Sequence, residues 1–205
     1  RWKTAHVREQ QGISFIAYKS LNNMPGLASL LYFWLRPLGF NSDQALSLSK
    51  SLEAIQPGKL LRSATHELSL DREELLLYPI PVAFPELELP FGTPFFELPG
   101  GEYQLTWGLP QKEIDRNPAN AIFDLDCLEF PLQLRSWQEG DRFNPLGMQS
   151  EKKISDFLID NKVPFALKKE VKVLVSGNKI AWVVGMRIAD WEKIGTDTKK
   201  CLLIQ

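Results

Sequence analysis

The sequence predicts an α+β protein, in which a helical hairpin with short strands precedes a β-rich part with one main helix. Apolar side chains between residues 25 and 55 recur every three or four positions, as on one face of a helix. After residue 100, short apolar runs alternate with polar residues and are bounded by turn residues, as in antiparallel strands. Six prolines between residues 79 and 99 separate the two patterns. We therefore expect two compact domains.

A helical hairpin is expected at the start of the first domain. Over residues 25–39, the apolar positions share one helical face: Leu27, Leu30, Leu31, Trp34, Leu35 and Leu38. Asn41 or Ser42 can cap a second helix that runs to Ile55. The pair is similar to a helix-turn-helix in shape, but Lys50 is the only cation in the second helix, so we favour packing over DNA reading.

Short strands and a linker are expected after the hairpin. The strand candidates are residues 59–64, 67–70 and 75–80. Residues 81–99 form a semi-rigid linker in this interpretation, because proline removes a backbone donor and favours extended chain. His66 with Asp71 would suit an independent hydrolase, but no nucleophile accompanies them, so local hydrogen bonding is the favoured role of His66.

Strand patterns dominate the second domain. The candidates are residues 102–109, 121–125, 130–137, 171–176, 179–186 and 199–204. Gly177-Asn178 between two of these runs predicts a tight hairpin. One helix is expected at residues 152–161, opened by the basic pair Lys152 and Lys153.

Positive charge gathers in the stretch from Arg135 to Lys169, which contains seven Lys or Arg residues. Residues 131–205 have a net charge of +4, whereas residues 1–130 have a net charge of −5. A loop shaped by glycine and proline, followed by a helix, can hold such cations on a rigid surface. The pattern therefore favours contact with a phosphate backbone.

The same stretch carries a family resemblance. The order GDRF-x-P-x-G-M, then KK-x-x-DF-x-I-x-x-K-x-P, resembles the C-terminal domain of bacterial tRNA(Ile)-lysidine synthetases, and IAWVVGMRI fits that family. The upstream segment LLRSATHELSLDREELLL is similar to the domain that precedes it in some members. The resemblance implies a connector from a missing catalytic domain at 1–24, a middle substrate-binding domain at 25–80 and a tRNA-binding domain at 100–205, the last two on either side of the Pro-rich linker at 81–99. The last is expected to be β-sandwich-like and to resemble a phenylalanyl-tRNA synthetase beta-chain module.

The resemblance implies particular site residues. The nucleic-acid contacts that match the family's basic positions are Arg135, Arg142, Lys152, Lys153 and Lys162. We also expect contacts from Lys168, Lys169 and Arg187. The expected loop organisers are Gly140, Asp141, Asn144, Pro145, Gly147 and Asp156. Because acids repel phosphate, we expect Asp141 and Asp156 to fix Arg142 or Lys153 by paired hydrogen bonds. The sequence Ala189-Asp190-Trp191 departs from the more basic ending of the family pattern.

Catalytic chemistry is expected to lie elsewhere. The family's ATP site is a Ser-Gly-Gly-x-Asp-Ser phosphate loop, and neither it nor GxxxxGK[ST] occurs in these 205 residues. We expect no catalytic residue, cofactor or metal site in this chain. The resemblance implies an N-terminal catalytic domain that uses ATP and Mg²⁺ to join lysine to C2 of the wobble cytidine of tRNA(Ile). It releases AMP and pyrophosphate, and the modification changes decoding from AUG to AUA.

The expected partners are tRNA(Ile), with its acceptor stem at the C-terminal domain, and the catalytic domain itself. No apolar run approaches the roughly 20 residues of a membrane span. Two cysteines, Cys127 and Cys201, fit a reducing compartment, so a cytoplasmic location is expected. The alternative function is a protein-interaction or dimerisation module whose basic face is merely solvated. The sequence leaves open a homodimer, the orientation of the two domains and the discrimination of tRNA(Ile) from tRNA(Met).

Overall fold

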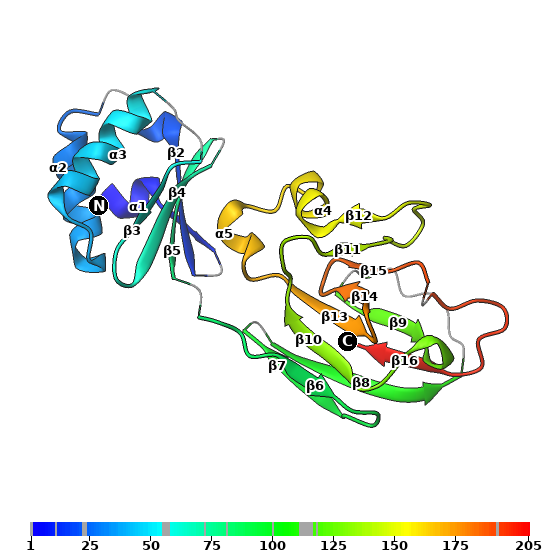
Figure 1. Ribbon diagram of the computed structural model, residues 1–205. Coiled ribbons are helices and arrows are strands. Elements are labelled where there is room, and N and C mark those ends of the chain that lie inside the picture. The colour runs from blue at the N-terminus through cyan, green and yellow to red at the C-terminus, as the bar shows by residue number, and fades with distance from the viewer. Residues whose placement is uncertain are drawn as a thin grey trace. The chain divides into compact units, whose positions relative to one another are not determined.

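The computed structural model describes residues 2–205 except 11, 22, 23, 55–57, 72, 81, 100, 111–116, 118 and 192. Ile55 and Pro81, predicted in the second helix and in the linker, lie outside the described residues. The chain divides into two compact units (Figure 1). Residues 1–82 and 164–167 form the first unit, and residues 83–163 and 168–205 form the second.

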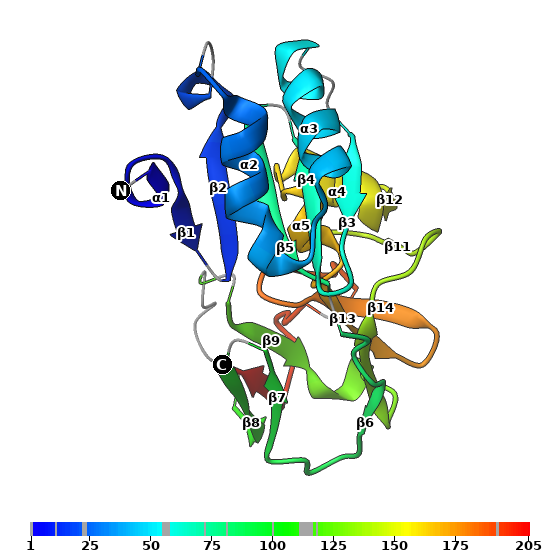
Figure 2. The same ribbon diagram turned by 90° about the vertical axis from the view of Figure 1, so that its left-hand side faces the viewer.

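The first unit is a five-stranded antiparallel sheet of order β1-β2-β5-β4-β3. Its strands are β1 (Arg8–Gln10), β2 (Ile13–Ala17), β3 (Leu60–Arg62), β4 (His66–Leu70) and β5 (Glu74–Pro79). Its helices are α1 (Trp2–His6), η1 (Tyr18–Ser20), α2 (Leu27–Leu35), η2 (Arg36–Leu38) and α3 (Ser42–Ala54). Figure 2 shows α2 and α3 side by side in front of this sheet. The predicted helical hairpin is therefore confirmed.

Local sequence explains the hairpin. The Asn41 side chain accepts from the backbone N–H of Gln44 at 2.8 Å, and the Gln44 side chain accepts from the N–H of Asn41 at 3.0 Å. This reciprocal cap satisfies amides that would otherwise lack partners at the start of α3. Behind it, Leu31 of α2 and Leu48 of α3 are fully buried in one core cluster with Leu68 and other strand residues.

The expectation that residues 1–24 are only a connector is corrected by β2. This strand pairs with β5 along its whole length, from Ser14 opposite Leu77 to Ala17 opposite Glu74. Ile16 packs in the cluster with α2 and α3, whereas Phe15 belongs to a second cluster on the other face of the sheet. A strand buried on both faces has no simple apolar alternation, which is why its pattern gave no strand prediction.

The buried carboxylate of Glu67 in this unit is paired. Glu67 is 0% exposed; its carboxylate accepts from Arg62 Nε at 2.7 Å and from the Tyr78 hydroxyl at 3.1 Å. Burial raises the pKa of Tyr78 to about 12. His66 bonds locally through Thr65 Oγ1 at 2.8 Å, and it begins β4 whereas Asp71 follows the end of that strand. The strand keeps these two residues apart, which leaves the hydrolase reading without a catalytic pair.

The second unit contains two sheets that enclose one core. One sheet has the order β15-β14-β13-β10-β6 and the other β7-β8-β16-β9. The first set of strands is β6 (Leu87–Leu89), β10 (Leu132–Ser136), β13 (Lys172–Ser176), β14 (Lys179–Val183) and β15 (Arg187–Ile188). The second set is β7 (Phe95–Leu98), β8 (Gly101–Leu109), β9 (Ala121–Asp124), followed by η3 (Leu125–Cys127), and β16 (Cys201–Ile204). Leu134, Trp182 and Phe123 meet between the sheets, as in a β-sandwich.

A small hairpin and a helix cover the outer face of the five-stranded sheet. They are β11 (Arg142–Phe143), β12 (Lys152–Lys153) and α4 (Ile154–Asp160), and the one-turn helix α5 (Phe165–Lys168) follows. Phe143 and Phe157 pack edge to face at 5.1 Å, above Val173 and Val183 of the sheet. The predicted β13–β14 hairpin is confirmed, with Gly177 at φ 58° in its turn. A left-handed φ of this kind favours glycine.

Two sequence expectations are corrected in this unit. Residues 81–99 are not simply a linker, because β6 pairs with β10 and β7 pairs with β8. Their prolines flank these two edge strands rather than interrupt them, and edge strands tolerate proline nearby. The predicted helix at 152–161 begins only at Ile154, because Lys152 and Lys153 form β12.

Within the described part of the chain, no helix is long and apolar enough to cross a membrane. The same residues contain no group of three or more His, Cys, Asp or Glu side chains placed to hold a metal ion.

Candidate nucleic-acid interface

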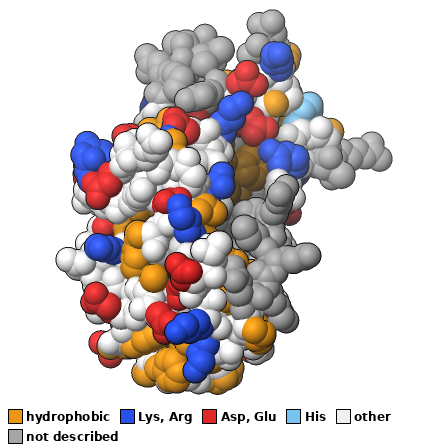
Figure 3. Space-filling view, turned by 90° about the vertical axis from the view of Figure 1, so that its right-hand side faces the viewer, with side chains coloured by type: hydrophobic (Ala, Val, Ile, Leu, Met, Phe, Trp, Pro, Cys, Tyr) orange, Lys and Arg blue, Asp and Glu red, His pale blue; other side chains and the backbone are white. Residues whose placement is uncertain are grey.

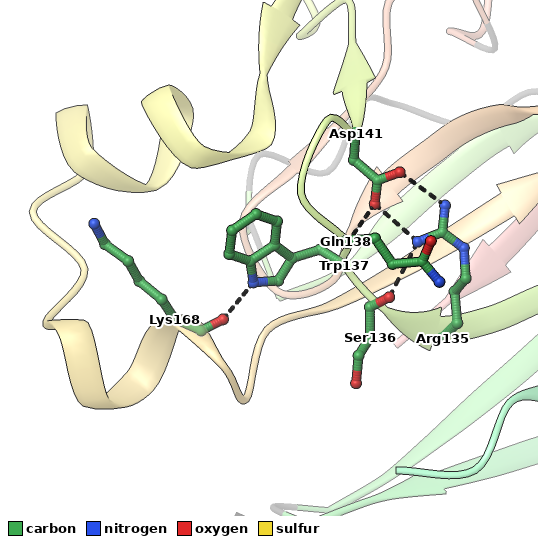
Figure 4. A network of polar contacts seen from close by, with 6 residues as sticks. All are labelled: Arg135, Ser136, Trp137, Gln138, Asp141 and Lys168. Atoms are coloured by element: carbon green, nitrogen blue, oxygen red, sulfur yellow. Dashed lines mark hydrogen bonds and ion pairs between the residues drawn. The ribbon is translucent and has the colours of Figure 1, made fainter. Parts of the chain in front are cut away.

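The loop between β10 and β11 is held by a bidentate ion pair. Arg135 donates to both carboxylate oxygens of Asp141, at 2.8 and 3.0 Å, and also to the carbonyl of Ser136 at 3.0 Å (Figure 4). The backbone N–H of Gln138 donates to the same carboxylate at 2.7 Å. Gly140 completes the turn at φ 95°. The charge of Arg135 is thus compensated within the loop.

This geometry corrects the expected partner of Asp141. Its carboxylate pairs with Arg135, not with Arg142 or Lys153. The Arg135 and Asp141 side chains are only 16% and 15% exposed, so this pair is largely withdrawn from solvent. Asp156, the other expected partner, contacts Ser155 at 3.3 Å in the first turn of α4 and no cation among the described residues.

Two cations face each other across the small hairpin. Arg142 in β11 and Lys153 in β12 are directly opposite in the antiparallel register. Both are exposed, and neither forms an ion pair with any described acidic side chain. Like charges placed directly opposite on neighbouring strands oppose pairing. Buried Phe143 fixes the hairpin beneath them. The Arg142–Lys153 cation pair is therefore a preorganised site of positive potential that lacks a described counter-ion.

The neighbouring lysine has a different environment. Lys152 forms an ion pair with Asp160 at the far end of α4, and its side chain is only 22% exposed. Lys152 and Lys153 are adjacent in the sequence, but successive side chains of a strand point to opposite faces, so the two lysines lie on different faces of the hairpin. Lys152 lies opposite Phe143 and reaches along α4, whereas Lys153 lies opposite Arg142.

The remaining basic candidates are spread over other elements. Lys162 is exposed at the end of α4 with φ 55°, and Arg187 is exposed in β15. Lys168 is partly buried, and its carbonyl accepts from the Trp137 indole at 2.5 Å (Figure 4). Lys169 is exposed. Figure 3 shows one face of the molecule, on which Lys and Arg side chains are interspersed with Asp and Glu. Among these candidates, Arg142 and Lys153 are the two that a strand register places directly opposite each other in the described part of the chain.

An organiser that the sequence reasoning missed is Asp190. Its carboxylate accepts from the backbone N–H of Gly147 at 3.0 Å and from Lys193 at 2.7 Å. These two bonds, the one from Gly147 foremost, lower the pKa of the Asp190 carboxyl below its ordinary value. No local sequence pattern marks this contact, because Gly147 and Asp190 are 43 positions apart in the chain.

The other expected organisers lie in the same loop. The carbonyl of Asn144 accepts from Asp190 N–H at 2.8 Å, and Pro145 forms a bridge with Ala189. Gly147 adopts φ 84°, a left-handed turn that favours glycine. The side-chain oxygen of Asn144 is buried and has no hydrogen-bond partner among the residues that the structure describes.

Both units match known family models. Residues 9–80 match the TilS substrate binding domain, and residues 132–203 match the TilS substrate C-terminal domain. The tRNA(Ile)-lysidine synthase of Bacteroides thetaiotaomicron is 37% identical over 188 residues, covering 92% of this chain and 42% of that protein. The corresponding protein of Parabacteroides distasonis is 34% identical over 196 residues, covering 90% of this chain and 42% of the relative. The chain thus spans about two fifths of the length of these relatives.

Solved structures include two similar chains. A crystal structure of a TilS C-terminal domain has 21% identity and a TM-score of 0.45, covering 62% of this chain and 91% of that one. An N-terminal fragment of the phenylalanyl-tRNA synthetase beta-subunit from Pyrococcus horikoshii has 15% identity and a TM-score of 0.44. It covers 86% of this chain and 65% of that fragment.

Proposed function

Because this chain belongs to the tRNA(Ile)-lysidine synthase family and matches the C-terminal part of its members, we propose that it holds tRNA(Ile) for a separate catalytic domain. The reaction proposed for the whole enzyme joins lysine to C2 of the wobble cytidine, with ATP and Mg²⁺ bound in the catalytic domain. AMP and pyrophosphate leave, and decoding changes from AUG to AUA. The setting is the cytoplasm.

The observation that carries this proposal is the Arg142–Lys153 cation pair. Two exposed like charges directly opposite each other weaken the hairpin that bears them, unless an external anion lies between or above them. A phosphate backbone supplies such an anion and releases counter-ions on binding. Arg142 can donate two parallel hydrogen bonds to one phosphate, whereas Lys153 adds a compact point charge.

The other basic residues take one of two roles in this proposal. Lys162, Lys168, Lys169 and Arg187 extend the contact along the tRNA, with the acceptor stem at the second unit. Arg135 and Lys152 support the contact instead, since their charges are already paired with Asp141 and Asp160. Gly140, Asn144, Pro145 and Gly147 shape the loop that presents the cation pair.

A salt titration tests the proposal. We expect fluorescence anisotropy with a labelled, unmodified tRNA(Ile) transcript to show binding that weakens linearly in log–log form with salt. The magnitude of this negative slope should decrease by roughly 0.7–0.9 for each phosphate contact removed. It should therefore decrease by about 1.4–1.8 in the Arg142→Ala, Lys153→Ala double variant.

The competing function is a protein-interaction or dimerisation module with a solvated basic face. It predicts no measurable tRNA binding, and a concentration-dependent change of mass in sedimentation that the double variant leaves unaltered. An unchanged slope in the double variant would also contradict the proposed role of the cation pair.

A further inference from the structure

The hairpin that bears the cation pair is a separate two-stranded sheet, and backbone contacts join it to the rest of the second unit in addition to the packing of Phe143. The loop after β11 runs antiparallel to the segment after β15, with Pro145 bridged to Ala189. Leu146 N–H donates to the carbonyl of Ile188 at 2.9 Å, and Asp190 N–H donates to the carbonyl of Asn144 at 2.8 Å. These contacts form a short backbone seam.

One side chain extends the seam by a further contact. Asp190 Oδ1 accepts from the N–H of Gly147 at 3.0 Å, and Oδ2 accepts from Lys193 at 2.7 Å. The Asp190 side chain is 24% exposed, so water competes only partly for these bonds. Gly147 is exposed and its φ of 84° places it in a tight turn, where the hydrogen bond that its N–H donates to Asp190 fixes the direction of the chain.

Cations lie at both ends of this seam. Arg142 precedes Pro145 by three residues, and Arg187 precedes Ala189 by two residues. Because the two segments are antiparallel, Arg142 and Arg187 lie toward opposite ends. A rigid seam therefore sets the spacing between the Arg142–Lys153 cation pair and Arg187, and a polyanion with fixed phosphate spacing is sensitive to that distance.

We propose that Asp190 is a positioning residue for tRNA binding: by holding the Gly147 turn to the segment after β15, it joins the Arg142–Lys153 cation pair and Arg187 into one phosphate-contacting surface. This inference rests on the proposed tRNA-binding function. It predicts that the Asp190 carboxylate increases the affinity for tRNA. Charge repulsion alone would predict that a carboxylate near a polyanion site lowers this affinity.

Two substitutions separate geometry from charge. Asp190→Ala removes the acceptor for the Gly147 N–H. It should lower the affinity for an unmodified tRNA(Ile) transcript about threefold to tenfold, and it should reduce the magnitude of the log–log salt slope by roughly 0.7–0.9, the value of one phosphate contact. Asp190→Asn removes the same charge but keeps an acceptor oxygen, so its affinity should equal or slightly exceed that of the parent chain. Exchange of the Gly147 amide with deuterium should accelerate in the Ala variant and much less in the Asn variant.

A double-mutant cycle with Arg187→Ala separates positioning from general loss of structure. If Asp190 acts through the spacing to Arg187, the double variant should bind about as weakly as the weaker single variant, since both remove the same contact. Additive losses would overturn the positioning role, as would parent-like affinity and slope in Asp190→Ala. The positioning role would also be overturned if Asp190→Asn lost binding while the hydrogen bond from the Gly147 N–H remained intact. If the Ala variant does not fold, the Asn variant decides whether Asp190 has this role.

The two levels of inference fail differently. If the unsubstituted chain binds no tRNA at any salt concentration, the proposed function falls, and the role of Asp190 falls with it. If the unsubstituted chain binds with a steep salt slope and Asp190→Ala binds equally well, only the role of Asp190 is overturned.

Discussion

Lys152 and Lys153 are adjacent in sequence, but their substitution by alanine should have opposite consequences. Lys153→Ala removes one of two facing like charges and should stabilise the chain by about 0.2–1 kcal/mol. A cation at the start of α4 is also slightly unfavourable with the helix dipole, and Lys153 provides no side-chain cap that would be lost. The same substitution should reduce the salt slope of tRNA binding by roughly 0.7–0.9.

Lys152→Ala should do the reverse. It breaks the ion pair with Asp160 and exposes part of α4, which should cost about 0.2–1 kcal/mol of stability, a range set by the 61% exposure of Asp160. Its charge is already paired, so the salt slope should change by much less than one contact. Stability and binding therefore move in opposite directions for the two variants.

The assays are urea unfolding followed by circular dichroism and anisotropy titration of labelled tRNA(Ile) at several salt concentrations. Lys199→Ala is the matched control, because Lys199 is an exposed cation of the second unit that precedes β16 in the other sheet. Lys199→Ala should change the free energy of unfolding and the salt slope of tRNA binding only by the small effect of removing one remote charge. The reasoning is refuted if Lys153→Ala destabilises the chain and leaves the slope unchanged, or if both lysine variants behave alike.

Three further outcomes are expected. Burial raises the pKa of both Tyr18 and Tyr78 from 10.0 to about 12, so their contribution to stability is complete below pH 10 and is lost as pH rises through 12. Urea unfolding between about pH 10 and 12 should therefore show a falling free energy of unfolding, and a flat profile would contradict this. Limited proteolysis should cut first near Val82, which is 90% exposed at the boundary of the two units, and first cleavage inside residues 135–169 would contradict that boundary. The chain alone should make no lysidine from ATP, lysine and tRNA(Ile), because the Ser-Gly-Gly-x-Asp-Ser loop is absent from its 205 residues, so release of AMP that depends on both lysine and tRNA would overturn this expectation.

Sequence periodicity predicted the helices and strands that have one buried and one exposed face. The α2–α3 hairpin and the β13–β14 hairpin were recognisable because a single apolar stripe or a Gly-Asn turn suffices to specify them. Strand β2 was missed because both of its faces are buried, which removes the alternation. Strands β6 and β7 were missed because proline was read as a breaker, whereas it flanks these edge strands.

The site was predicted as a set of charges, not as a set of pairings. The sequence shows which residues are basic, but partner choice depends on register and distance. Arg135 is engaged by Asp141 and Lys152 by Asp160, and only the β11–β12 register reveals that Arg142 faces Lys153. Asp190 was overlooked because a residue 43 positions from Gly147 gives no local signal of the bond between them.

Hydrogen–deuterium exchange of the chain with and without unmodified tRNA(Ile) tests the central claim most directly, because it locates the contact without substituting any residue. The account predicts that tRNA slows exchange across the β11–β12 hairpin and its loop, residues 141–153, and that added salt abolishes this protection together with binding. Protection confined to other parts of the chain, with unchanged exchange at residues 141–153, would contradict the claim that the Arg142–Lys153 cation pair meets the tRNA backbone.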